Sequence, residues 1–184
     1  MKFLWYANIS SRLLFYKKKR HDMTKTLLIP TDFQIESLNM LKFALEEQTE
    51  PVKIILLYGN NLNGSISELL FYSRKSILDK LLHPSFRETL EILKNRFENV
   101  IHCISIELLN HNGSGLLRNL LEAHKVDVIY VPKSYKLRPG LHGFDPVPRL
   151  RAAGVVVREL AWSSPANEEN HLQTLFVPAT NLNN

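Results

Sequence analysis

The stretch Thr26-Leu27-Leu28-Ile29-Pro30-Thr31-Asp32-Phe33 decides how this chain is expected to fold. Its apolar residues predict a short strand buried on both faces, as in a parallel sheet, because the run is brief and Pro30 bounds it. Asp32 follows in the turn before a helix. Open parallel sheets bind ligands just outside the carboxyl ends of their strands, so Asp32 is a candidate binding residue.

Outward from this stretch, strand-like and helix-like segments alternate along the chain. The strands are expected at 26–29, 52–58, 101–108, 126–131 and 155–160. The helices are expected at 35–45, 65–82, 84–97, 114–123 and 146–153, with Pro84 in a first turn, Ser114 and Asp145 as N-caps and Gly154 as a terminator. Such alternation predicts an α/β fold, a parallel sheet with helices on both faces.

The composition is that of one ordinary globular domain with a substantial core. Hydrophobic residues make up 45% and charged residues 22% of the 184 residues, and no apolar run approaches the ~20 residues of a membrane-spanning helix. The net charge of +5 suggests nucleic-acid binding, but residues 1–22 carry all of it. The rest of the chain holds equal numbers of basic and acidic residues, so no nucleic-acid partner is expected.

Residues 1–22 combine aromatic and aliphatic side chains with a basic run at 17–20. The basic residues follow the apolar part and Arg12 interrupts it, so the segment is unlike a secretory signal. Two interpretations stay open. The segment is a basic membrane-surface anchor, or it lies outside the domain, disordered or ahead of a true start at Met23.

These boundaries predict a domain at 23–162 and a tail at 163–184. The tail holds a strand-like run at 174–177, which is expected to pair at a sheet edge of its own subunit or of a second one.

Cysteine and histidine offer little chemistry. Cys103 is the only cysteine and is expected to be a small buried residue rather than a nucleophile. The seven histidines are scattered, and none is spaced four residues from a second metal ligand on one helix, so no metal site is expected. No nucleophile elbow or Walker loop is present.

Residues 23–160 resemble the universal stress protein family. The resemblance rests on the opening 25–33 with Glu36-Ser37-Leu38, on Ile54-Ile55-Leu56-Leu57-Tyr58 followed by a long two-part helical excursion, and on Ala123-His124-Lys125-Val126-Asp127-Val128-Ile129. It implies a doubly wound sheet of five strands in the order 3-2-1-4-5, like that of the adenine nucleotide alpha hydrolases. It also implies a crevice between strands one and four.

In ATP-binding members of this family, an acidic residue after strand one faces the nucleotide, and Asp32 matches it. After strand four these members carry Gly, two residues, Gly, nine residues, and then Gly with Ser or Thr. Glycines let the backbone approach phosphates, and a helix N-terminus supplies N–H donors.

The spacing of this cradle survives here, but its residues do not. Pro132 and Tyr135 stand at the two glycine positions, and Asp145-Pro146 replaces Gly-Ser/Thr. Proline donates no N–H, tyrosine adds bulk, and an aspartate at a helix N-terminus repels phosphate. The resemblance therefore implies a degenerate ATP loop.

One route to an anion remains in the same loop. Lys133, Lys136 and Arg138 supply three cations and Ser134 a hydroxyl, and such side chains bind anions where the backbone does not. The alternative is that they are solvated loop charges.

Two functions from different classes follow. The first is a cytoplasmic, non-catalytic stress-response or interaction module, homodimeric, with an unknown protein partner, no resident cofactor and weakened or lost ATP binding. The second is a sensor of ATP, another nucleotide or a small anion, which would use Asp32, Lys133, Ser134, Lys136 and Arg138. Nucleotide hydrolysis has the least support, because no positioned base or metal pair is evident.

Overall fold

The computed structural model describes residues 24–61, 73–110, 114–140 and 142–162. The strands are β1 (Thr26–Pro30), β2 (Val52–Asn60), β3 (Ile101–Leu109), β4 (Val128–Pro132), β5 (Gly143–Phe144) and β6 (Val156–Leu160). The helices are the 3₁₀ turn η1 (Ile35–Ser37), α2 (Leu38–Glu46), α4 (Arg74–Leu81), α5 (Pro84–Arg96), α6 (Ser114–Ala123) and α7 (Val147–Arg151).

The long strands form a parallel sheet in the order β3-β2-β1-β4-β6. This is the expected order, with β6 as its fifth strand. The sheet has a sixth member because the two-residue β5 pairs antiparallel with the end of β2. β1 lies in the middle, between β2 and β4, so the turn that follows it opens at the switch point of the sheet.

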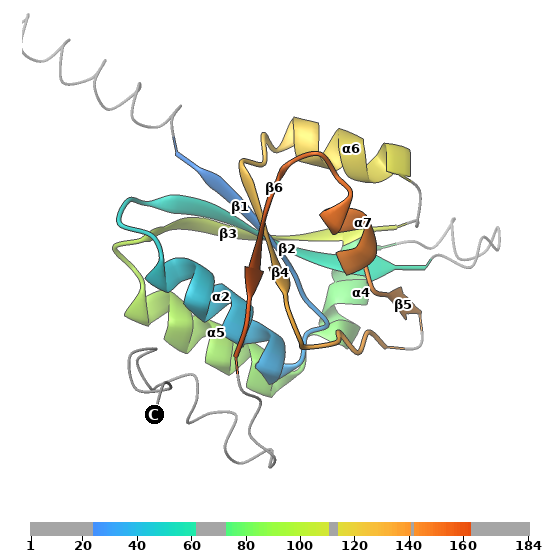
Figure 1. Cartoon of the computed structure of the whole chain (residues 1–184). Helices are drawn as coiled ribbons and strands as arrows, with labels where there is room; N and C mark the ends of the chain where they lie inside the picture. The colour runs from blue at the N-terminus through green and yellow to red at the C-terminus, as the bar shows by residue number, and fades with distance from the viewer. Residues whose placement is uncertain (1–23, 62–72, 111–113, 141, 163–184) are drawn as a thin grey trace, which may run out of the picture.

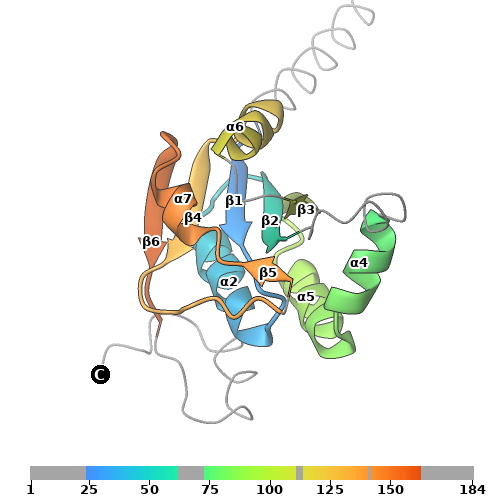
Figure 2. The ribbon, with the colours of Figure 1, turned by 90° about the vertical axis from the view of Figure 1, so that its right-hand side faces the viewer.

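Helices cover both faces of this sheet, as the alternating pattern predicts. Figures 1 and 2 show α2 and α5 on one face and α6 and α7 on the other, while α4 lies beyond the β3 side. All five residues of β1 are buried, since β1 has strands on both sides and helices above and below.

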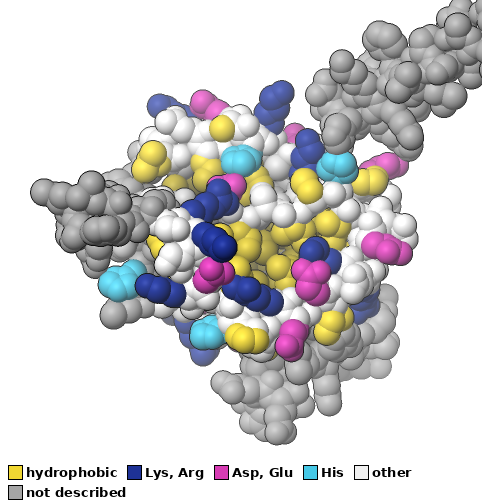
Figure 3. All heavy atoms as spheres, turned by 180° about the vertical axis from the view of Figure 1, so that it is seen from behind, with side chains coloured by type: hydrophobic (Ala, Val, Ile, Leu, Met, Phe, Trp, Pro, Cys, Tyr) yellow, Lys and Arg dark blue, Asp and Glu magenta, His cyan; other side chains and the backbone are white. Residues whose placement is uncertain are grey.

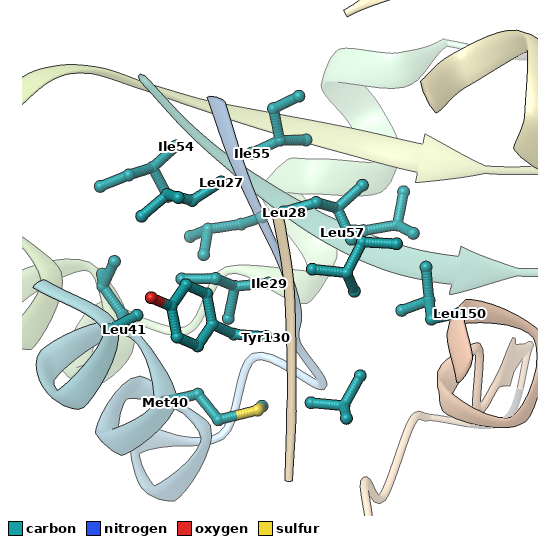
Figure 4. Close-up of a cluster of buried hydrophobic side chains, with 14 of the residues drawn as sticks. Leu27, Leu28, Ile29, Met40, Leu41, Ile54, Ile55, Leu57, Tyr130 and Leu150 are labelled. Atoms are coloured by element: carbon teal, nitrogen blue, oxygen red, sulfur yellow. The ribbon is translucent and has the colours of Figure 1, made fainter. Parts of the chain in front are cut away.

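The core gathers around β1. Figure 4 shows side chains of β1 and β2 packed between Met40 and Leu41 of α2 and Leu150 of α7, with Tyr130 of β4 beside them. Each aliphatic side chain buried in this way contributes about 1.5–3 kcal/mol. The core is thus placed directly beneath the turn that carries Asp32.

Several boundaries differ by a few residues from the expected ones. The first helix opens as a 3₁₀ turn before α2. β2 continues to Asn60, because β3 and β5 pair with its last residues. Pro84 does begin α5, and Gly154 does follow α7 in the left-handed region, with a φ of 74°.

Some expected features lie outside the described residues. These are residues 1–22, the first part of the helix expected at 65–82, the turn at 112–113 and the strand expected at 174–177. Among the described residues, no helix is both long and apolar enough to cross a membrane.

The expectation that Cys103 is buried is wrong, because its side chain is exposed. It lies near the start of β3, the outermost strand on its side of the sheet. An outer strand has no neighbour beyond it to cover its side chains, so an apolar pattern in the sequence does not ensure burial there.

Gly59 of β2 lies very close to the backbone of β5. A Cβ at Gly59 would overlap the carbonyl oxygen of Phe144, whereas a Cβ at Gly115 in α6 would meet nothing within 4 Å. We expect Gly59→Ala to destabilise the fold by about 1–3 kcal/mol through backbone displacement. Gly115→Ala should stabilise it by up to about 1 kcal/mol. Urea unfolding of both variants provides the measurement, and equal midpoints would contradict the close approach.

Candidate functional site

The turn after β1 holds a residue in a costly backbone conformation. Phe33 has a φ of 60°, in the left-handed region that non-glycine residues rarely adopt. Its N–H donates to the hydroxyl of Thr31 at 3.0 Å. Its ring stacks on Tyr58 at 5.0 Å and meets Phe86 of α5 edge-on at 5.4 Å. Aromatic packing thus holds the turn in the conformation that aims Asp32 at the crevice.

Asp32 is buried, with 4% of its surface exposed. Both oxygens of its carboxylate accept hydrogen bonds. Oδ1 accepts the N–H of Gln34 at 3.0 Å. Oδ2 accepts the hydroxyl of Tyr135 at 2.6 Å and the N–H of Arg138 at 2.9 Å. Since a buried carboxylate without donors is strongly destabilising, these three bonds are what allow Asp32 to lie inside.

The segment between β4 and β5, which we call the bridging loop, runs across the end of β1. It leaves β4 where the N–H of Lys133 donates to Leu160 of β6 at 2.8 Å. It contacts Asp32 in its middle and reaches β2 at its end, where β5 pairs with Gly59 and Asn60. The loop therefore runs from β4 to β2 across the carboxyl end of β1.

Tyr135 is the residue of this loop that joins Asp32 to Trp162. Burial, followed by the hydrogen bond to Asp32, raises the pKa of its hydroxyl far above the ordinary value of 10. Its ring packs against Trp162, beyond β6, with a centroid separation of 5.6 Å. Leu137 is buried in the same loop. The tyrosine thus stays neutral and donates its proton to the carboxylate throughout the physiological pH range.

The residues expected to bind a ligand are only partly brought together. Arg138 reaches Asp32, but through its backbone N–H rather than its guanidinium. The side chains of Lys133, Ser134, Lys136 and Arg138 are exposed, and within the described residues none donates to Asp32. The structure therefore places a set of exposed cations on the outside of a closed loop.

The end of the loop leads into α7. The expectation that Asp145 is the N-cap is wrong, because Pro146 occupies the N-cap position and Asp145 lies one residue before it. Oδ1 of Asp145 accepts the N–H of Val147, the first residue of the helix, at 2.9 Å. The carbonyl of Pro132 accepts the guanidinium of Arg151 at 2.9 Å. Asp145 and the carbonyl of Pro132 are thus both hydrogen-bonded to groups of the chain itself.

Two residues of this site do not follow from the sequence patterns. The resemblance gives Tyr135 only as a bulky residue at a glycine position, and no pattern singles out Trp162. The available signal was chemical: a phenol in the loop after strand four can reach a carboxylate after strand one, since these strands are neighbours. Among the described residues, no group of three His, Cys, Asp or Glu side chains is arranged to hold a metal ion.

The raised pKa of Tyr135 predicts an alkaline weakening of the fold. Above about pH 10 the unfolded chain releases the tyrosine proton while the folded chain keeps it, so stability falls as the pH rises. Stability contributed by this tyrosine is fully present below pH 10. We expect the wild-type free energy of unfolding to fall between pH 9 and 11 more steeply than that of Tyr135→Phe, measured by urea unfolding.

Tyr58 and Tyr130 also have raised pKa values, caused first by burial, so both proteins should lose some stability in this range. Parallel profiles for the wild type and Tyr135→Phe would contradict a buried Tyr135–Asp32 bond.

The geometry can be compared with solved structures. No protein-family model matches the sequence, and no curated protein matches it. A universal stress protein crystallised in complex with cAMP matches with a TM-score of 0.51 at 16% identity, over 76% of this chain and 98% of that one.

Two further structures match less closely. The hypothetical protein PH0823 has a TM-score of 0.48 at 20% identity, over 78% of this chain and 99% of that one. Universal stress protein UspA from Lactobacillus plantarum has a TM-score of 0.45 at 13% identity, over 74% and 97%. The first match, together with the observed strand order, establishes that this chain has the fold of the universal stress proteins.

Proposed function

We propose that this chain is a non-catalytic, universal stress protein-like module that acts through protein contacts and does not bind ATP in the usual way. The observation that carries the proposal is the engagement of Asp32 by Tyr135, Arg138 and Gln34. The carboxylate at the expected ligand position already has its partners within the chain.

A nucleotide at this position would have to displace those partners. Each donor withdrawn from a buried carboxylate costs about 1.5–3 kcal/mol, unless the ligand supplies an equivalent one. The ring of Tyr135 would have to leave its packing against Trp162 as well. Closure of the bridging loop therefore competes directly with ligand binding.

Two residues at the expected phosphate-binding positions also oppose phosphate binding. Pro132 has no N–H to donate, and Asp145 places a carboxylate at the start of α7. The helix itself has only five residues. These features support weakened or lost ATP binding.

The second candidate is a nucleotide or small-anion sensor, and a specific observation favours it. The exposed side chains of Lys133, Ser134, Lys136 and Arg138 lie on the loop that covers the crevice, and a neighbour with the same fold was crystallised with cAMP. In this alternative the cations attract an anion, and the loop opens to admit it.

Thermal unfolding of the full chain with millimolar ATP, ADP, AMP, cAMP and cyclic dinucleotides separates the two candidates. A ligand at 100 times its dissociation constant adds about 2.7 kcal/mol, which raises the melting temperature by several degrees. We expect no shift with any of them for the wild type.

The matched variant for this test replaces Lys133, Lys136 and Arg138 by alanine. The exposed side chains make the triple variant close to neutral for stability. A shift in the wild type that disappears in this variant would overturn the proposal and establish the sensor. A shift that survives in it would place a nucleotide elsewhere and contradict both.

Sheet edges supply the surface for a protein partner, and we propose that one of them forms a homodimer. β3 and β6 are the outer strands of the described sheet. Seen from the β3 side, Figure 3 shows hydrophobic side chains gathered at the centre of the face and ringed by charged ones. Yet Arg74 donates to the carbonyl of Ile106 and bonds Glu107 at 3.3 Å, so part of the β3 edge is occupied.

The β6 edge is more open to a second copy. Val156 is 61% exposed, which is the largest exposed fraction among the described large hydrophobic residues. An uncovered edge strand offers unpaired N–H and C=O groups to an identical strand. An antiparallel pairing of two β6 strands would bury both copies of Val156.

Sedimentation equilibrium of Val156→Lys tests this interface. Lysine on an edge strand opposes strand pairing, because its charge cannot be buried between two copies. We expect the wild type to sediment as a dimer and Val156→Lys as a monomer. Cys103→Lys, an exposed change on the β3 edge, is the matched control and should stay dimeric. A monomeric wild type would contradict the homodimer.

A further inference from the structure

The bridging loop presents its charged side chains on one side. Residues 133–140 include two lysines and one arginine and no aspartate or glutamate. Tyr135 and Leu137 are turned into the protein, whereas Lys136 and Arg138 between and after them are exposed. This alternation is that of an extended segment, in which residues two apart share a side and lie about 7 Å from each other. Lys136 and Arg138 therefore form a short line of positive charge on the outer side of the loop.

The backbone beneath these cations is anchored at both ends of the line. The N–H of Lys133 donates to the carbonyl of Leu160 at 2.8 Å, and the N–H of Arg138 donates to Asp32 at 2.9 Å. Between these two points, the hydroxyl of Tyr135 donates to the same carboxylate at 2.6 Å. A loop that is fixed in this way loses less conformational freedom when a partner binds, so it is a good platform for recognition.

These cations differ from most arginines of the described chain in having no carboxylate partner. The arginines that lie within 4.0 Å of a carboxylate oxygen are Arg74, Arg87, Arg118, Arg151 and Arg158. Within residues 24–61, 73–110, 114–140 and 142–162, the side chains of Lys133, Lys136 and Arg138 take part in no ion pair or hydrogen bond. Their charge is therefore available to an outside partner.

We propose that the outer side of the bridging loop binds an extended acidic segment of a partner protein, with carboxylates opposite Lys133, Lys136 and Arg138. This inference rests on the proposed function, in which the chain acts through protein contacts. Alternate side chains of an extended peptide are also about 7 Å apart, so acidic residues at every second position meet Lys136 and Arg138 in register. Complementary charges of this kind give an interface its orientation and its specificity.

The distribution of charge favours a peptide over other anions. A small anion needs its donors gathered around one point, whereas these cations are spread along an extended segment. A nucleic acid needs a broad basic face, but residues 23–184 hold equal numbers of basic and acidic side chains. A short acidic segment is the partner whose dimensions match three cations on one loop.

Fluorescence anisotropy of the full chain with a fluorescein-labelled peptide of alternating glutamate and serine tests the proposal. A peptide with glutamine in place of every glutamate is the matched control. We expect saturable binding of the glutamate peptide and none of the glutamine peptide. The affinity for the glutamate peptide should fall as salt is added, because exposed charges are screened.

Charge reversal in the protein assigns the surface. Lys136→Glu with Arg138→Glu should weaken binding of the glutamate peptide at least about tenfold, because repulsion replaces attraction at two positions. Lys136→Gln with Arg138→Gln should weaken it by a smaller factor and places no new carboxylate near Asp32, so it serves if the first variant does not fold. Lys75→Glu with Lys80→Glu changes two exposed lysines of α4 and is the matched control, expected to bind like the wild type.

Four results would overturn the proposal. The first is that the glutamate peptide does not bind. The second is that binding is unchanged by Lys136→Gln with Arg138→Gln, which would assign it to another basic segment. The third is an equal loss in the α4 control, which would reduce the effect to net charge. The fourth is a single-stranded oligonucleotide that displaces the glutamate peptide and binds more tightly through the same two residues.

The outcome is separable from that of the proposed function. A nucleotide that raises the melting temperature contradicts the proposed function, whatever the peptide does. A melting temperature that no nucleotide changes, together with no binding of the glutamate peptide, contradicts only the inference about the acidic segment.

Discussion

The carboxylate of Asp32 joins the turn after β1 to the loop after β4, and the arrangement of this end of the sheet depends on it. The Asp32 carboxylate can be buried because Tyr135, Arg138 and Gln34 donate three hydrogen bonds to it. The turn after β1 depends on Phe33, which has a left-handed backbone. Its ring stacks on Tyr58 and meets Phe86 edge-on, and these contacts hold the turn in place. Removing one donor would therefore disturb the turn, the loop and the β5 pairing together.

The partners of the same carboxylate come from within the chain. The strand order places Asp32 at the switch point, where doubly wound sheets bind ligands. The chain fills that position with its own tyrosine and backbone N–H. The side chains of Lys133, Lys136 and Arg138 on the bridging loop are exposed to solvent.

Two polar residues of α2 are buried among its apolar ones. Asn39 and Lys42 are as buried as the leucines of the same helix. Trp162 packs between Phe43 of this helix and Tyr135 of the bridging loop. These three rings thus connect α2 to the loop that contacts Asp32.

Local patterns in the sequence determined the strand and helix order, the parallel sheet, the proline start of α5 and the glycine end of α7, because each depends on a residue and its near neighbours. They also placed Asp32 directly after the first strand, at the carboxyl end of the sheet. Only the tertiary structure decided what Asp32 binds, that Cys103 is exposed on an outer strand, and that Asn39 and Lys42 are buried. These depend on contacts between residues far apart in the chain, such as Asp32 with Tyr135, for which hydrophobic periodicity and local propensity carry no information.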